Sequence, residues 1–210
     1  MARRVGFVVE CGPAGADEQL CREFCRAVMG DVACDFACLD NKMRLLDEAA
    51  PAAAKLLATG CERVLIVWDL MPAWPDKDEA PCRHAERQRL LVSLAAARLR
   101  DKPIYLVCVE RQLESWLLAD AEKLGEFLST DAHAYKAIAV VKDPDREPDP
   151  KAAVISHFKH ARGWRYLDSR DAVRVVKAGP IDLRRLRRSA SFARFEAKLA
   201  ATPPCSGGDR

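Results

Sequence analysis

The chain has 210 residues, of which 50% are hydrophobic and 31% are charged, and its formal net charge is +3. This length suits one large domain, or one domain with an appended piece, and supplies enough apolar residues for a sizeable core. Such a small net charge does not by itself indicate a nucleic-acid-binding protein. No apolar stretch approaches the length of a membrane-spanning helix, and Glu10 ends the first apolar run too early for a signal peptide. We therefore expect a soluble, cytoplasmic protein.

The charge is unevenly distributed along the chain. Residues 1–160 carry 22 Lys and Arg against 26 Asp and Glu, a net charge of −4, whereas residues 161–198 carry 11 against 4, a net charge of +7. A basic segment on an acidic body could contact phosphate groups. A set of solvated helix faces would give the same pattern.

The chain has nine cysteines, and no two of them form a Cys-x-x-Cys pair. Most lie in apolar segments, where a free thiol packs as a small hydrophobic group. Cys21 and Cys25 have helical spacing, but no matching His pair accompanies them. We expect reduced and mostly buried thiols rather than disulfides or zinc ligands.

The hydrophobic pattern predicts alternating strands and helices over the first two thirds of the chain. In chain order, the first part is predicted as a strand at 4–10, a helix from Asp17 (its N-cap) to Met29, a strand at 32–39, a helix at 45–59 and a strand at 63–69. The next part is predicted as a Pro-rich loop at 71–81, a helix at 82–100, a strand at 103–110, a helix at 114–127, a further candidate strand at 137–141 and a polar loop at 143–150. Three helical segments are predicted near 151–160, 169–177 and 181–200.

This alternation predicts an α/β fold with a mostly parallel sheet and helices on both of its faces. The polar loop at 143–150 is the best candidate boundary. We expect an α/β core over residues 1–142, a helical C-terminal extension over 143–200 packed on that core, and a disordered tail over 201–210.

Three of the four predicted strands end in a carboxylate: Glu10, Asp69 and Glu110. Because the carboxyl ends of parallel strands meet at one edge, where ligands of such folds bind, these side chains should gather there. Glu114 would share a helix face with Glu110 and could reach the same edge. Gathered carboxylates repel one another unless a cation neutralises them, and oxygen ligands favour Mg²⁺ or Mn²⁺. Alternatively, each residue merely ends a strand in water.

Several other chemistries lack their motifs. The sequence contains no HExxH, no GxSxG, no GxxxxGK[ST] and no GxGxxG. A zinc protease, a serine hydrolase, a P-loop NTPase and a Rossmann dinucleotide site are therefore not expected.

The stretch from Val107 to Asp120 contains Glu110, Glu114 and the run Trp116-Leu117-Leu118-Ala119-Asp120. It resembles the Glu-rich, Trp-Leu-Leu-Ala-Asp region of an uncharacterised bacterial TOPRIM-like family, domain of unknown function 4276, which is related to the TOPRIM and OLD-type nucleases. Two further stretches, 149–151 and 189–195, resemble later motifs of that family. The resemblance covers nearly the whole chain and implies a TOPRIM-like, Rossmann-like fold.

The resemblance implies a Mg²⁺-dependent nuclease or related phosphoryl-transfer enzyme acting on DNA or RNA, in phage defence beside an ATPase partner protein. Glu10 and Asp69 would hold the metal, and Glu110 or Glu114 would supply a further ligand or position water. Lys151, or a lysine such as Lys142, would stabilise charge on the phosphate. The arginines expected to contact the nucleic-acid backbone are Arg184, Arg185 and Arg188, although these could equally form a solvated helix face.

Two features depart from the TOPRIM pattern. Glu10 is followed by Cys11-Gly12 rather than by glycine and a prompt second glutamate, and the Asp-x-Asp of TOPRIM is here Asp69-Leu70-Met71. A thioether is a poor ligand for Mg²⁺, although Asp76 or Asp78 could substitute from the following loop. A non-catalytic sensor or interaction subunit with a degenerate metal site is therefore the alternative function. A small-molecule phosphotransferase or phosphatase is a third option.

Overall fold

The computed structural model describes residues 3–73, 80–129, 134–135, 138 and 141–201. Four strands form one sheet in the order β2-β1-β3-β4: β1 (Arg4–Val9), β2 (Ala33–Cys38), β3 (Arg63–Asp69) and β4 (Ile104–Val109). All the strand pairs are parallel, so the carboxyl ends of the four strands lie on one edge. The predicted α/β class with a parallel sheet is confirmed.

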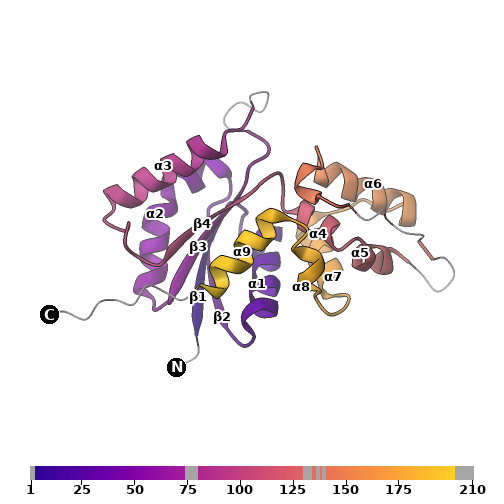
Figure 1. Cartoon of the computed structure of the whole chain (residues 1–210), viewed down its shortest axis with the longest axis horizontal. Coiled ribbons are helices and arrows are strands. Elements are labelled where there is room, and N and C mark those ends of the chain that lie inside the picture. Colours follow the sequence, from indigo (N-terminus) through magenta and orange to yellow (C-terminus); the bar gives the residue numbers. More distant parts are fainter. Residues whose placement is uncertain (1–2, 74–79, 130–133, 136–137, 139–140, 202–210) are drawn as a thin grey trace.

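Helices cover both faces of the sheet, as expected (Figure 1). One face packs against α1 (Ala16–Met29) and α9 (Ala190–Ala200), and the other against α2 (Lys42–Ala58) and α3 (Arg83–Ala96). Alternate strand residues supply the two cores, for example Leu65 on the α1 side and Ile66 on the α2 side. Among the described residues, no helix is long and apolar enough to cross a membrane.

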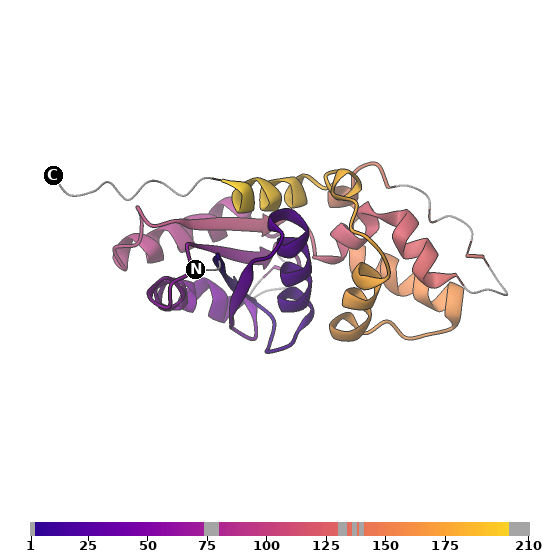
Figure 2. The same ribbon diagram turned by 90° about the horizontal axis from the view of Figure 1, so that it is seen from below.

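A helical lobe lies at the carboxyl edge of the sheet, beyond the ends of the strands (Figure 2). Its helices are α4 (Glu114–Ala119), α5 (Ala121–Leu128), α6 (Pro150–Arg162), α7 (Val173–Lys177) and α8 (Leu183–Leu186), with a 3-10 turn at Pro144–Arg146 and a π-helical turn at Asp168–Ala172. Helices on the two sides of the boundary predicted between residues 142 and 143 contact each other. Helices α4 and α5 already pack with α6 and α7, whereas α9 returns to the sheet.

The structure divides two helices that the sequence predicts as continuous. The segment 114–127 breaks at Asp120, where the backbone leaves the helical region (φ −105°, ψ 63°) and the side chain accepts a hydrogen bond from the Lys123 N–H to cap α5. The segment 181–200 breaks into α8 and α9, and Ser189 caps α9 through the Phe192 N–H. The candidate strand at 137–141 and the predicted tail lie largely outside the described residues.

Buried polar contacts fix the lobe against the sheet layer. The Asp145 carboxylate accepts hydrogen bonds from the hydroxyls of Ser189 (2.8 Å) and Ser191 (3.0 Å) and from the Ser191 N–H (2.9 Å). The Trp116 indole N–H donates to the Ser191 hydroxyl at 2.8 Å, and the Trp116 ring packs edge-on against Phe192 with ring centroids 5.3 Å apart. The stretches 107–120 and 189–195, singled out in the sequence, therefore meet at this junction.

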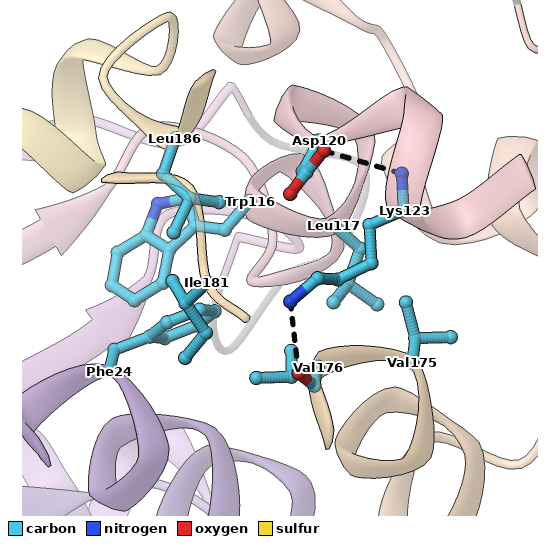
Figure 3. A pocket seen from close by; sticks show the side chains of 9 residues that line it. All are labelled: Phe24, Trp116, Leu117, Asp120, Lys123, Val175, Val176, Ile181 and Leu186. Carbon is cyan, nitrogen blue, oxygen red and sulfur yellow. Dashed lines mark hydrogen bonds between the residues drawn. The ribbon is translucent and has the colours of Figure 1, made fainter. Parts of the chain in front are cut away.

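Lys123 is a second buried polar group in the lobe (Figure 3). Its ammonium donates to the carbonyl oxygens of Val176 (3.1 Å) and Gly179 (2.8 Å), at the C-terminal end of α7. The adjoining cavity holds about 10 Å³, which is near the roughly 10–15 Å³ that one water molecule needs. This lysine therefore ties helices together rather than lining a ligand site.

The eight cysteines in the described part of the chain are all free thiols. Cys21, Cys25, Cys61 and Cys108 are buried, three others are partly buried, and Cys82 is exposed. Reduced thiols were expected from the sequence, and the described cysteines agree.

We predict that Asp145→Ala lowers the free energy of unfolding by about 3 kcal/mol, because it leaves buried hydroxyl and N–H donors without their acceptor. Chemical denaturation measures this change. Asp143→Ala is the matched control, because Asp143 lies two residues away and pairs with an exposed Arg146, a kind of ion pair that contributes roughly 0–1 kcal/mol. Equal effects of the two substitutions would contradict the structural role of Asp145.

Candidate functional site

Glu10 and Asp69 lie side by side at the carboxyl edge of the sheet. Strands β1 and β3 are neighbours, with Val9 opposite Val67. Glu10 follows β1 directly, and its Oε1 accepts a hydrogen bond from the backbone N–H of Asp69, the last residue of β3, at 2.9 Å.

Asp17 joins these two carboxylates from the first turn of α1. The loop between β1 and α1 folds tightly, with the Gly15 N–H donating to the Gly12 carbonyl at 3.0 Å. A Cβ at Gly15 would lie 2.6 Å from the Cys11 Cβ, so the close approach requires glycine. The Cys11 backbone N–H lies near the Asp17 carboxylate and lowers its pKa, against the larger effect of burial. The N-cap is Gly15 rather than Asp17, which leaves the Asp17 side chain directed at the site.

The helical lobe contributes Glu114 and its partners. Glu114 begins α4 and is 7% exposed. Its carboxylate accepts a hydrogen bond from the Tyr166 hydroxyl at 3.3 Å and lies 3.8 Å from the Lys151 ammonium. Lys151 also pairs with Asp168.

Local sequence explains where Lys151 points. Asp149 caps α6 by accepting from the Ala152 N–H at 2.8 Å, and Pro150 occupies the first helical position. The Asp-Pro-Lys motif therefore starts the helix so that Lys151, in its first turn, lies beside Glu114.

The four carboxylates of Glu10, Asp17, Asp69 and Glu114, here called the carboxylate cluster, all have raised pKa values. Burial, followed by the charge of Asp17, raises the pKa of Glu10 to about 7. Burial and Glu114 raise the pKa of Asp17 to about 6. Burial and Glu10 hold the pKa of Asp69 well above its usual range. Burial also raises the pKa of Glu114, against the opposing charge of Lys151. Negative charge is under-compensated at this point in the fold.

The donor set fits a hard divalent cation. The Asp69 Oδ1 is buried and has no hydrogen-bond partner among the described residues, which leaves an oxygen available to a ligand. Carboxylate oxygens are the ligands that Mg²⁺ and Mn²⁺ prefer. As they stand, no three or more His, Cys, Asp or Glu side chains among the described residues are arranged to hold an ion. Binding would therefore draw the four carboxylates closer together.

Glu110, the other acidic candidate, is engaged elsewhere. Its Oε1 pairs with the guanidinium groups of Arg83 and Arg194, the latter at 2.6 Å. Of the two glutamates that the sequence proposed, the structure places Glu114 in the cluster. Asp76 and Asp78 lie outside the described residues, and Lys142 is exposed.

Six of the eleven arginines and lysines of the basic segment form ion pairs within the protein. Arg185 pairs with Asp120, Glu122 and Asp182, and Arg188 donates to the Ala119 carbonyl oxygen at 3.4 Å. Other arginines and lysines of the segment that form ion pairs are Arg170, Arg174, Lys177, Arg187 and Arg194. Arg184 is exposed. The expectation that Arg184, Arg185 and Arg188 contact nucleic acid rests on sequence pattern, and two of the three are committed to contacts inside the lobe.

Sequence reasoning missed Asp17, Tyr166 and Asp168 as members of the site. The sequence pattern predicts Asp17 as a helix cap, and the other two carry no motif. An acidic residue in the first turn of the helix that follows Glu10 was the available signal. Comparison of the chain with protein-family models, curated proteins and solved structures finds no match.

We predict that the metal-free protein loses stability as the pH rises. The folded-state pKa of Glu10 is about 7 against an ordinary 4.5, so between these values the folded protein binds more protons than the unfolded chain. The free energy of unfolding should then fall with pH, by up to about 1.4 kcal/mol per pH unit for each such group.

Mn²⁺ should reverse this loss, because it binds the ionised carboxylates of the folded state. Thermal unfolding at about pH 5.5 and about pH 8, with and without Mn²⁺, measures both effects. A melting temperature that Mn²⁺ leaves unchanged at the higher pH would argue against a cation site.

Proposed function

We propose that this protein is a Mg²⁺- or Mn²⁺-dependent phosphodiesterase acting on nucleic acid, with the carboxylate cluster as its active centre. The observation that carries the proposal is the meeting of four carboxylates from four separate segments at the carboxyl edge of a parallel sheet. Ligands of α/β proteins bind at such an edge. The four carboxylates would hold the ion, which when bound would neutralise charge on the phosphate and lower the pKa of a water molecule.

Hydrolysis of a phosphodiester adds a water oxygen to phosphorus and breaks the bond from phosphorus to the leaving oxygen. One proton must leave the attacking water and one must reach the leaving oxygen. The pKa of Glu10 is about 7 in the metal-free site, and a bound cation would lower it, so Glu10 would act as an ionised ligand of the ion. The Tyr166 hydroxyl donates to Glu114 and orients that carboxylate.

Lys151 supplies the positive charge of the site. Burial opposes its charge, but Asp168 and Glu114 outweigh burial and raise its pKa, so the ammonium stays protonated. A fixed ammonium beside the cluster would stabilise negative charge that develops on the phosphate oxygens.

The resemblance to the TOPRIM-like family, domain of unknown function 4276, agrees with this chemistry. It extends the proposal to a cytoplasmic role in phage defence with an ATPase partner protein. Function does not follow from a fold alone, so the proposal rests first on the carboxylate cluster.

A non-catalytic sensor or interaction subunit is the second candidate. The observation that favours it is the absence, among the described residues, of three acidic, His or Cys side chains already arranged around an ion. Met71 also favours the interaction-subunit function, because it occupies a position at which TOPRIM enzymes have an acidic residue.

We predict that purified protein cleaves single-stranded DNA or RNA in Mn²⁺ and that Asp69→Asn lowers the rate about 100-fold or more, as loss of a charge-stabilising group typically does. Gel analysis of labelled oligonucleotides measures the rate. Asp69→Asn should not lower the melting temperature of the metal-free protein at about pH 8, because burial already disfavours the charge of Asp69. Activity lost without loss of stability separates a catalytic role from a structural one.

Asp101→Asn is the matched control, because Asp101 is exposed in the turn before β4. It should leave the rate unchanged. If the wild-type protein cuts no DNA or RNA in Mg²⁺ or Mn²⁺, the interaction-subunit function replaces the nuclease.

A further inference from the structure

A cationic hollow of about 270 Å³ lies over the edge strand β4, between α3 and α9. Trp68 and Cys108 form part of its apolar lining, and Arg83, Arg87, Arg194 and Lys198 surround it. The two arginines of α3 approach from one face of the sheet, and the two cations of α9 from the other. None of the described residues that line the hollow is acidic.

The positive charge in this hollow exceeds the negative charge beside it. Glu110 is the carboxylate that pairs with its lining, and it is shared between Arg83 and Arg194. Glu86, which accepts the Trp68 indole N–H at 2.8 Å, is paired with Lys42 instead. Within the part of the chain that the structure describes, four cations therefore face one carboxylate.

Part of this arrangement has a structural explanation. Lys198 donates to the Leu106 carbonyl oxygen, and Arg194 donates to the Cys108 carbonyl oxygen at 3.3 Å. These bonds cover carbonyl groups of an edge strand, which otherwise invite pairing with another chain. Each of these bonds uses one N–H donor, whereas an ammonium group has three N–H donors and a guanidinium group has five.

The cations also crowd one another. Burial, followed by the charges of Arg194, Arg87 and Arg83, lowers the pKa of Lys198 to about 8. Capping two carbonyl groups does not require Arg83 and Arg87 to stand beside Lys198. An anion in the hollow would relieve this repulsion.

We propose that this hollow binds a phosphate group of the nucleic-acid strand whose backbone is cut at the carboxylate cluster, an assignment that rests on the proposed function. Guanidinium groups match the geometry of phosphate oxygens. The volume falls just below the roughly 300–1,000 Å³ of pockets that enclose a whole small molecule, which suits a single phosphate group with part of its sugar.

The position of the hollow relative to the cluster supports the same strand as its ligand. Trp68 lines the hollow, and Asp69, the next residue of β3, belongs to the cluster. Strands β1, β3 and β4 are consecutive in the sheet. Trp68 and Asp69 point to opposite faces of β3, so the two sites lie on opposite faces of the sheet near its carboxyl edge. A nucleic-acid backbone passing along this edge could engage both.

Fluorescence anisotropy of a labelled single-stranded oligonucleotide, measured in EDTA to prevent cleavage, tests the proposal. The expected result for Arg87→Ala is binding weakened by roughly tenfold, as for loss of one charge-assisted hydrogen bond. The slope of log affinity against log salt should also fall by roughly 0.7–0.9, the value for one phosphate contact. Arg87 is exposed, so the substitution should not disturb folding.

Arg89→Ala is the matched control, because Arg89 lies on the same helix but pairs with Asp47, away from the hollow. It should lower neither the affinity nor the slope. Equal effects of Arg87→Ala and Arg89→Ala, or no binding by the wild-type protein, would overturn the proposal. So would binding of free adenosine monophosphate at this site without binding of the oligonucleotide, since the ligand would then be a nucleotide.

Hydrolysis of bis(p-nitrophenyl) phosphate by the wild-type protein in Mn²⁺ keeps the two proposals apart. Hydrolysis of this small diester together with an oligonucleotide affinity that is insensitive to Arg87→Ala would retain the active centre and remove the phosphate site. An affinity that depends on Arg87, without cleavage of any substrate, would retain the phosphate site and remove the proposed catalysis.

Discussion

The buried hydrogen bonds that join Asp145 and Trp116 to Ser191 hold the helical lobe against the sheet layer, and the candidate site depends on them. Glu10 and Asp69 belong to the sheet, whereas Glu114 and Lys151 belong to the lobe. If the lobe were displaced, the two halves of the site would separate. Full satisfaction of the Asp145 carboxylate makes its burial tolerable, because a buried carboxylate without partners would cost far more than each bond contributes.

The same packing creates an electrostatic problem at the carboxyl edge. Four carboxylates are brought together in a partly buried setting, and Lys151 compensates them only in part. Protonation relieves the repulsion at low pH, and a divalent cation would relieve it at neutral pH. Folding stability alone would favour fewer acids at this position.

The positive charges of the protein include two groups, those in ion pairs elsewhere and those that line the hollow over β4. Five of the eleven cations of the basic segment, including Arg185 and Arg187, form ion pairs away from the hollow. Arg194 and Lys198 instead join Arg83 and Arg87 over β4, where positive charge is in surplus. An acidic centre and a basic hollow suit the proposed polyanionic substrate, since the hollow would attract the backbone and the centre would act on it.

The sequence by itself determined the strands, their parallel arrangement and the meeting of Glu10 with Asp69. These features follow from short apolar runs, from alternation with helices and from the common edge of parallel strands. Tertiary structure alone decided that Glu114 rather than Glu110 joins the cluster, that Asp17 completes it, and that the arginines gather over β4. Such choices depend on contacts between distant residues, such as Tyr166 with Glu114, 52 positions apart. Local periodicity carries no information about pairings of that kind, because they are set by how the lobe packs on the sheet.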